Sequence, residues 1–222
     1  MIKVVIFDVD GTMLDTEQLN AQAFGEAFKG LGYESPDVDL VEWYNKNCSG
    51  KGSRWAFKIL HDVIDFNDDF NLQYVRDFRA EWLKTQHIQM KKGLMEMLEW
   101  LKQNNVPMAV CSSDYTDKVT AKLELAGVPL DYFKVIVGMD LCKNPKPDPE
   151  CYILTCKKLG VKPEEAVAIE DSDSGALSAA EAGVKLMLFP DIAQNSDTVK
   201  KKSWRIVNSF DEALEFIKQG LK

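Results

Sequence analysis

Short apolar stretches alternate with segments of helical periodicity from residue 94 to the end of the chain, and this alternation restricts the possible folds more than any other feature. Strands that alternate with helices form a parallel sheet whose two faces are covered by those helices. The sequence therefore predicts an α/β fold. The expected strands are 106–111, 135–137, 166–169, 184–189 and 205–207, and the expected helices are 94–103, 115–126, 149–159, 174–182 and 210–219.

A long helical segment separates one more strand from this series. Residues 3–7 form a continuous apolar run, rich in β-branched side chains, that is typical of a buried strand. Residues 17–90 show helical spacing throughout, with no convincing strand. A lone strand cannot form a parallel sheet, so residues 3–7 must join the later strands in space. We therefore expect an all-helical insertion of roughly 75 residues after the first strand.

Charge and hydropathy argue against several classes of protein. The formal net charge is −8, from 27 basic and 35 acidic residues, whereas a nucleic-acid-binding protein usually presents a basic face. No apolar run approaches the roughly 18–20 residues of a membrane span, and the first residues lack the pattern of a signal peptide. The five cysteines are irregularly spaced without a CxxC pair, which indicates reduced thiols in a cytoplasmic protein.

Two aspartates follow the first strand directly, in the stretch "VVIFDVDGTMLDTE". Asp8 and Asp10 are close enough to repel each other, so a metal ion, a proton or bulk water must compensate their charges. Gly11 would allow the backbone to turn tightly after them. By itself this motif fits either a metal-assisted nucleophile with an acid/base partner or a solvated, Asp-rich turn.

Hydroxyl groups and one lysine follow two later strands. Ser112 and Ser113 lie in the stretch "VCSSD", where they could bind an anionic oxygen or cap the next helix. We expect one of Ser113 and Asp114 to be the cap, which leaves Ser112 for a pocket. Lys146 stands between prolines in "NPKPDPE", and the stiff backbone there fits a positioned charge as well as an ordinary loop.

Acidic residues follow a further strand. Glu170 and Asp171 in "AIEDSDSG" could simply serve the N-terminus of the next helix. In open α/β sheets, however, ligands bind outside the carboxyl ends of the strands, so all these side chains should meet at one edge. Oxygen ligands with few nitrogens suit Mg²⁺. A lysine, a hydroxyl and Mg²⁺ together suit a phosphoryl group.

The order of these motifs, "DVDGT", then Ser112, then "KPDP", then "EDS", resembles the four motifs of the haloacid dehalogenase-like hydrolase superfamily over nearly the whole chain. The insertion is similar to the small helical cap of the β-phosphoglucomutase-like and phosphoglycolate phosphatase-like branch. The resemblance implies a Rossmann-like, three-layer core made of residues 1–14 and 91–222. It implies a helical cap domain made of residues 15–90.

The resemblance also implies roles for individual residues. Asp8 would be the nucleophile that forms an aspartyl-phosphate, and Asp10 would protonate the leaving group and then activate water. Which of the two acids in "EDS" binds the metal directly is left open. The implied phosphate-binding residues are Gly11, Ser112, Ser113 and Lys146, and the implied Mg²⁺ ligands are Asp8, Asp10 (through its backbone carbonyl), Glu170 and Asp171.

Three further positions bear on the substrate. Lys51 and Arg54 lie in the Gly-rich stretch "SGKGSRWA", where a basic residue of the sugar-phosphate branch meets the substrate, although a solvent-facing turn fits as well. β-Phosphoglucomutases carry a histidine shortly after "DT", and this chain has Asn20 there, which favours a phosphatase over a mutase. The true dehalogenases lack an acid at the position of Asp10, so carbon–halogen cleavage is rejected.

The sequence thus predicts a Mg²⁺-dependent phosphatase that acts on a small phosphorylated metabolite, with a sugar phosphate as the favoured class. The first alternative is an intramolecular phosphotransferase of the β-phosphoglucomutase type. The second is a non-catalytic ligand-binding protein on the same fold. No nucleic-acid or membrane partner is expected.

Overall fold

The computed structural model describes residues 1–33, 37–48, 52–60, 62–63, 68–192 and 194–221. Its centre is one six-stranded, all-parallel sheet in the order β3-β2-β1-β4-β5-β6. The parallel α/β fold expected from the alternating pattern is therefore confirmed. The strands are β1 (Val4–Phe7), β2 (Met108–Cys111), β3 (Phe133–Val137), β4 (Ala166–Glu170), β5 (Lys185–Leu188) and β6 (Arg205–Ile206).

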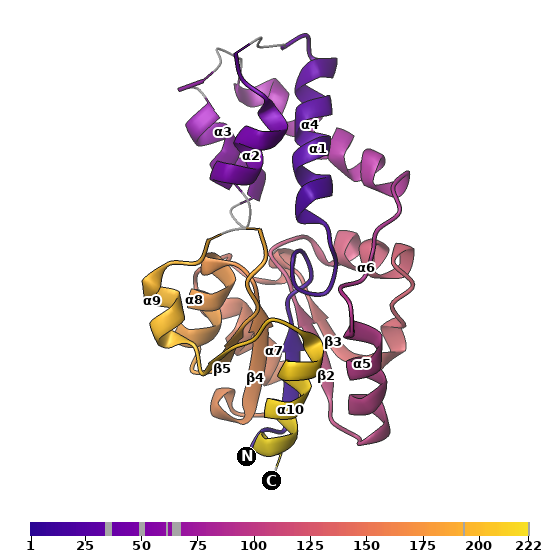
Figure 1. The fold of residues 1–222 in the computed structure, drawn as a ribbon, viewed down its shortest axis with the longest axis vertical. Helices are drawn as coiled ribbons and strands as arrows, with labels where there is room; N and C mark the ends of the chain where they lie inside the picture. Colours follow the sequence, from indigo (N-terminus) through magenta and orange to yellow (C-terminus); the bar gives the residue numbers. More distant parts are fainter. Residues whose placement is uncertain (34–36, 49–51, 61, 64–67, 193, 222) are drawn as a thin grey trace.

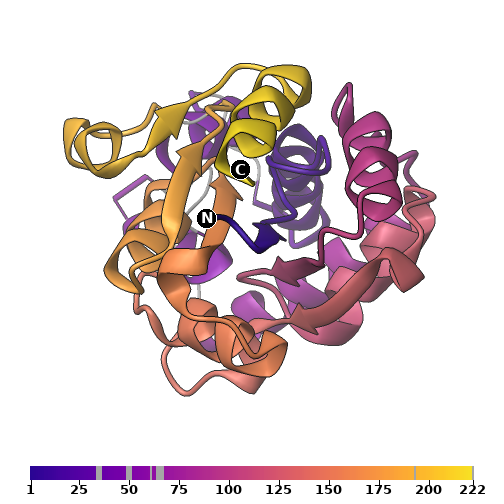
Figure 2. The ribbon, with the colours of Figure 1, turned by 90° about the horizontal axis from the view of Figure 1, so that it is seen from below.

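Helices cover both faces of this sheet (Figure 2). Alternate residues of β1 point to opposite faces, because successive side chains of a strand do so. Val5 and Phe7 belong to one apolar cluster with α5, α6 and α10, and Val4 and Ile6 belong to another with α7, α8 and α9. The helices are α5 (Leu94–Gln103), α6 (Thr116–Leu125), α7 (Glu150–Leu159), α8 (Asp173–Glu181), α9 (Asp197–Lys202) and α10 (Phe210–Gly220), with short 3-10 turns at Leu130–Tyr132, Met139–Leu141 and Pro163–Glu165.

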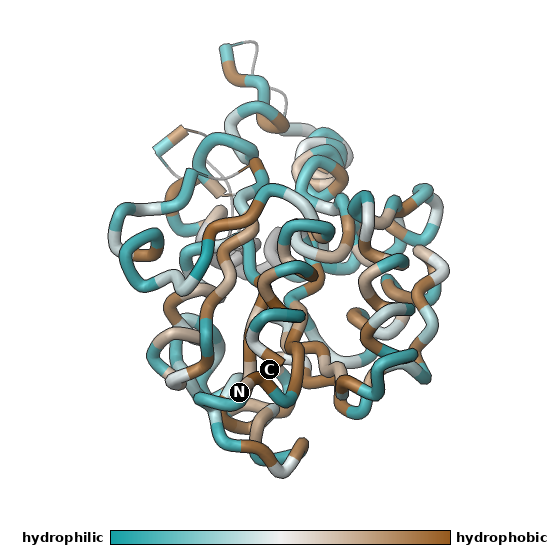
Figure 3. Tube along the Cα trace, turned by 60° about the horizontal axis from the view of Figure 1, so that its bottom comes forward, coloured by the Kyte–Doolittle hydropathy of each residue, from teal (hydrophilic) through white to brown (hydrophobic). Residues whose placement is uncertain are grey.

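The apolar residues are concentrated along the central strands, and the outer helices alternate between polar and apolar positions (Figure 3). All four residues of β1 are fully buried. In a strand buried on both faces, polar side chains would have a large desolvation cost, which explains the continuous apolar run in its sequence. The first polar residue after the run is Asp8, and the position of that residue is thereby fixed at the carboxyl end of the sheet.

The described helices between β1 and α5 lie beyond the carboxyl ends of the strands, on the side opposite to the two termini (Figure 1). We call residues 17–84 the helical insertion. Its helices have an apolar cluster of their own, which includes Phe24, Phe28 and Tyr44. The helices are α1 (Glu17–Gly30), α2 (Leu40–Cys48), α3 (Gly52–Leu60) and α4 (Asp68–Lys84).

The chain enters and leaves the helical insertion through two passages that run side by side. Leu14 of the first passage forms an antiparallel bridge with Met90 of the second. The Lys91 ammonium contacts the carboxylates of Asp15, at 3.1 Å, and Asp191, at 2.5 Å. The expected division into residues 1–14 with 91–222 and residues 15–90 stays a prediction.

Two other expectations concern cysteines and membranes. All five cysteines are free thiols, four of them buried. Among the described helices, none is both long enough and apolar enough to cross a bilayer.

Candidate functional site

The site lies at the carboxyl end of β1, where the order of the strands reverses. β2 lies on one side of β1 and β4 on the other, and a crevice opens at such a reversal in doubly wound sheets. Asp8, Ser112 and Asp171 are the first residues after β1, β2 and β4. A cavity of about 590 Å³ opens here between the strand ends and the helical insertion. Asp8, Asp10, Ser112, Ser113 and Lys146, which the sequence placed after separate strands, thus line one space.

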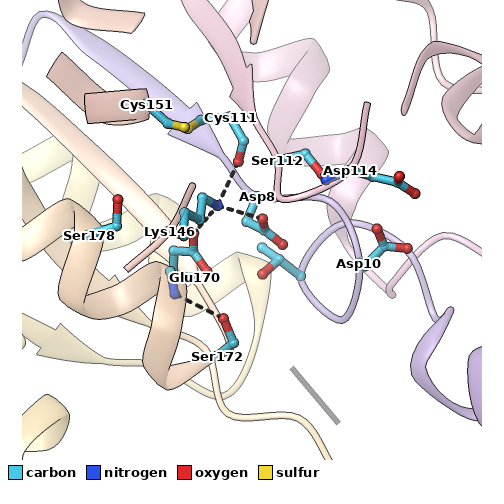
Figure 4. Close-up of polar contacts among 12 residues, drawn as sticks. Asp8, Asp10, Cys111, Ser112, Asp114, Lys146, Cys151, Glu170, Ser172 and Ser178 are labelled. Carbon is cyan, nitrogen blue, oxygen red and sulfur yellow. Dashed lines mark hydrogen bonds and ion pairs between the residues drawn. The ribbon is translucent and has the colours of Figure 1, made fainter. Parts of the chain in front are cut away.

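A buried lysine connects two of the acids. The Lys146 Nζ donates to Asp8 Oδ1 at 2.8 Å, to Glu170 Oε1 at 2.6 Å and to the backbone carbonyl of Cys111 at 2.9 Å (Figure 4). Tyr152 Oη also donates to Glu170 Oε1, at 2.5 Å. Three acceptors satisfy the three hydrogens of the ammonium group. The lysine is therefore fixed, as the flanking prolines suggested.

Asp171 lies beside this group and is held from two directions. Thr12 Oγ1 donates to Asp171 Oδ1 at 3.1 Å, and Asn195 Nδ2 donates to the Asp171 carbonyl at 2.6 Å. One carboxylate oxygen from each of Asp8, Glu170 and Asp171 lies within 4.8 Å of the others. All three residues are buried. Such a compact set of oxygen ligands fits a small, hard divalent cation.

Two carboxylates of this cluster, Asp8 and Asp171, hold their protons more tightly than free carboxylates do. Burial, followed by the charge of Glu170, raises the pKa of Asp8 to about 8. Burial, followed by the charge of Asp8, raises the pKa of Asp171 well above its usual range. Although burial alone would lower it, the pKa of Lys146 is raised by Asp8 and Glu170. One lysine does not neutralise three acids, and a bound divalent cation would remove the remaining repulsion.

Asp10 lies on the other side of Asp8, away from Lys146 (Figure 4). Its Oδ1 accepts a hydrogen bond from Thr16 Oγ1 at 2.6 Å, and its Oδ2 forms an ion pair with Lys122 Nζ. The same ammonium contacts Asp114 Oδ2 at 3.1 Å. Burial alone would raise the pKa of Asp114, but the charges of Lys122 and then Arg79 outweigh it and lower that pKa to about 2.

Sequence reasoning missed Lys122. A lysine in an exposed-looking helix is normally a surface residue. The available signal was its spacing, because Lys122 lies three residues after Val119 and next to Leu123, on the buried face of α6. The side chain of Lys122 is only 5% exposed.

The two serines differ in position. Ser112 is buried and its Oγ accepts a hydrogen bond from the Asp114 backbone N–H at 3.1 Å, whereas Ser113 is exposed; both line the cavity. The expectation that Ser113 or Asp114 caps α6 is wrong. The residue before α6 is Tyr115, which makes no side-chain cap, and the Thr116 backbone N–H donates to the Asp140 carboxylate at 2.7 Å.

Of the three site residues expected in the helical insertion, the structure describes the side chain of Asn20. Asn20 is buried in α1, lines the cavity and donates to Glu17 Oε1 at 3.5 Å. Lys51 and the side chain of Arg54 lie outside the described residues. Arg76 and Arg79 of α4, which the sequence did not single out, also line the cavity. The insertion therefore brings cationic side chains to the space above the acids.

Gly11 follows β1 and lies close to Asp171, which follows β4. The φ of Gly11 is +84°, and a Cβ at this position would overlap the Asp171 carboxylate. Gly11→Ala is therefore expected to displace Asp171 and to lower catalytic activity by about tenfold or more, in addition to about 1–2 kcal/mol of left-handed backbone strain. Urea unfolding measures the backbone strain, and a catalytic assay measures the effect of displacing Asp171.

Gly32→Ala is the matched control for that substitution. Gly32 has nearly the same φ, +82°, but nothing lies within 4 Å of the place that an added methyl group would take, so only the backbone strain should appear. If Gly11→Ala is no more harmful than Gly32→Ala, the proposed overlap with Asp171 is wrong.

Comparison with known proteins points to the family that the order of the motifs resembles. The family of haloacid dehalogenase-like hydrolases matches residues 5–189. The chain is 31% identical over 186 residues to the phosphorylated carbohydrates phosphatase of Thermotoga maritima, with 83% of each chain covered. It is 32% identical over 192 residues to the phosphoglycolate phosphatase of Aquifex aeolicus, with 84% of each covered. CbbY from Rhodobacter sphaeroides, in complex with xylulose-(1,5)bisphosphate, superposes with a TM-score of 0.80 at 26% identity, and 96% of each chain is covered.

The matched range contains the carboxyl ends of β1, β2 and β4, where the site lies. It begins within β1, before Asp8, and continues through Ser112 and Lys146 to the residue after β5. It also spans the helical insertion. The resemblance drawn from the motif order is therefore confirmed: the chain belongs to the haloacid dehalogenase-like hydrolase family.

Proposed function

We propose that the protein is a Mg²⁺-dependent phosphatase that hydrolyses a small phosphorylated metabolite of the sugar phosphate class. The observation that carries the proposal is the buried Asp8 carboxylate, bonded to Lys146 and next to Asp171, in a cavity of about 590 Å³. This volume suits a small metabolite. Relatives named as phosphatases of phosphorylated carbohydrates and of phosphoglycolate support the same reaction class. They also favour an enzyme over a non-catalytic binding protein.

In the proposed reaction, Asp8 attacks phosphorus and Asp10 handles the protons. A carboxylate oxygen of Asp8 bonds to phosphorus as the bond to the leaving oxygen breaks, and Asp10 gives its proton to that oxygen. Asp10 then accepts a proton from the water that attacks the aspartyl-phosphate, which releases phosphate and restores Asp8. Lys146 offsets the charge of the phosphoryl oxygens, and the Ser112 hydroxyl donates to one of them.

The acidic cluster fits a Mg²⁺ ion. Its ligand atoms are all oxygens within 4.8 Å, and the raised pKa values of Asp8 and Asp171 indicate that the cluster lacks positive charge. Asp8, Asp171 and the Asp10 carbonyl would hold the ion. Glu170 Oε1 accepts from Lys146 and Tyr152, which gives Glu170 a role in orienting Lys146. The buried Glu170 Oε2 has no hydrogen-bond partner among the described residues, so this oxygen could also help to hold the ion. When bound, Mg²⁺ supplies charge neutralisation for the phosphoryl oxygens.

The helical insertion, together with the passages on either side of it, is proposed to form a cap domain of residues 15–90. This cap would close over a core made of residues 1–14 and 91–222. The hinges would be near 14–17 and 90–93, where the two passages run side by side. Closure would exclude water from the acids. Asn20, Arg76 and Arg79 line the cavity from the insertion, and these are the residues that would contact the part of the substrate distant from the phosphoryl group.

Phosphate release from a panel of phosphorylated metabolites tests the proposal. Sugar phosphates should release phosphate in the presence of Mg²⁺, and excess EDTA should stop release. Full activity in the chelator would contradict the metal assignment. β-Glucose 1-phosphate separates the alternatives, because a mutase converts it to glucose 6-phosphate and a phosphatase yields free phosphate.

A further inference from the structure

A buried lysine outside the four motifs contacts the proposed acid/base residue. The side chain of Lys122 is 5% exposed, and its Nζ pairs with the carboxylates of Asp10 and Asp114. Burying an ammonium group and its partners has a large desolvation cost, and an apolar side chain in the same place is often neutral or stabilising. Stability alone therefore does not account for a lysine on the face of α6 that also carries Val119 and Leu123.

Lys122 is one of two donors that together fix the Asp10 carboxylate. Thr16 Oγ1 donates to Oδ1 at 2.6 Å, and Lys122 Nζ pairs with Oδ2. Because each carboxylate oxygen has its own donor, the plane of the group is set as well as its position. Proton transfer needs the donor and the acceptor within hydrogen-bond reach, and small misplacements lower the rate strongly.

Lys122 is itself held from a second direction. Asp114 Oδ2 lies 3.1 Å from its Nζ, and Asp114 is at the end of the segment that follows β2. Arg79 Nη2, from α4 of the helical insertion, lies 3.8 Å from the same Asp114 oxygen. Asp114 thus contacts both Lys122, which holds Asp10, and Arg79 of the helical insertion.

We propose that Lys122 is a positioning residue that holds the Asp10 carboxylate in the orientation required for proton transfer, with Asp114 as its anchor. The proposal rests on the function proposed above, in which Asp10 protonates the leaving group. Lys122 lines the same cavity as Asp10, and as a positioning residue it would act through Asp10 rather than on the phosphoryl group itself. Its loss should therefore affect substrates in proportion to their need for a proton on the leaving oxygen.

Lys122→Met keeps the length of the side chain and removes the ammonium group. Phenyl phosphate and p-nitrophenyl phosphate are the probes, because they are similar in shape while phenoxide needs protonation more than nitrophenoxide does. The expected loss of kcat/KM is about tenfold or more for phenyl phosphate and under about threefold for p-nitrophenyl phosphate. Lys122→Arg, which retains the charge, should recover part of the loss.

Lys118→Met is the matched control. Lys118 lies on the same helix, one turn earlier, and lines the same cavity, so its loss removes a cation without removing a donor to Asp10. It should change kcat/KM equally for the two compounds. Asp114→Asn is the second variant, since it keeps Lys122 and weakens its anchor; it should show the same preference for p-nitrophenyl phosphate, to a smaller extent.

Two results would overturn the proposal: equal losses for both compounds in Lys122→Met, or a rise in KM with unchanged kcat, which would make Lys122 a substrate-binding residue. Crystal structures of the wild type and Lys122→Met give a readout that does not need activity. A rotated or disordered Asp10 carboxylate in the variant supports the proposal, and an unchanged one refutes it. If the wild-type protein releases phosphate from neither of these compounds nor from the sugar phosphates of the panel, the proposed function is wrong, and the crystal structures still decide the role of Lys122.

Discussion

Asp8→Asn is expected to abolish phosphate release, by roughly a thousandfold or more, while the protein stays folded. An amide lacks the anionic oxygen that bonds to phosphorus, and no other carboxylate among the described residues accepts a hydrogen bond from Lys146 except Glu170. Phosphate release under saturating substrate and Mg²⁺ measures the loss. Retained turnover would contradict the assignment of Asp8 as the nucleophile.

The same variant gives a second result that separates an electrostatic effect from loss of fold. The pKa of Asp8 is raised to about 8 in the folded chain, mainly by burial, so the folded state keeps a proton that the unfolded state has released. Stability from this group is present below the unfolded pKa and is lost as the pH rises through about 8. Such a group changes the free energy of unfolding by about 1.4 kcal/mol per pH unit.

Wild-type protein in EDTA should therefore become less stable between pH 5 and pH 8, and Asp8→Asn should lose less over the same range. Mg²⁺ should flatten the dependence in the wild type by compensating the acids. Urea unfolding at fixed ionic strength measures all three curves. A steeper loss of stability in Asp8→Asn than in the wild type would contradict the account of the acidic cluster.

Lys146→Met is expected to have the largest effect on stability, about 3–5 kcal/mol, and to abolish activity as well. The lysine is 1% exposed and pairs with two buried carboxylates, so its removal leaves Asp8 and Glu170 without their cation. Urea unfolding in EDTA measures the stability, because bound Mg²⁺ would hide part of the loss.

Two controls define what this loss means. Lys102→Met removes a lysine from a surface pair with Asp131, where both side chains are largely exposed, and should cost less than about 1 kcal/mol. Lys146→Met leaves the carboxyl groups of Asp8 and Glu170 without their lysine partner. Adding Glu170→Gln removes one of these two carboxyl groups, so it should restore part of the stability but none of the activity. If the double variant is no more stable than the single one, unpaired charge is not the cause.

Local pattern was sufficient for the elements that carry the site. The apolar runs of β1, β2 and β4 end where the first polar side chains appear, at Asp8, Ser112 and Glu170, so these residues could be placed at strand ends from the sequence. Asp171 follows Glu170 directly. The order of those motifs also indicated the family. These features depend on residues close together in the chain, whose burial and periodicity their neighbours reveal.

The capping of α6 could not be predicted in this way. Ser113 and Asp114 are the residue types that cap helices, but the free N–H of Thr116 is taken by Asp140, 24 residues further along. A cap depends on which acceptor is nearest in space, and the nearest acceptor here comes from another loop.

The sequence by itself determined a parallel α/β core, a helical insertion after its first strand, and a set of acids, hydroxyls and one lysine at the strand ends. Only the tertiary structure decided how their charges pair. Lys122 lies 112 residues from Asp10 and Lys146 lies 138 residues from Asp8. A buried charge is stable only beside its partners, and packing of the crossover helices against the sheet is what brings these partners together.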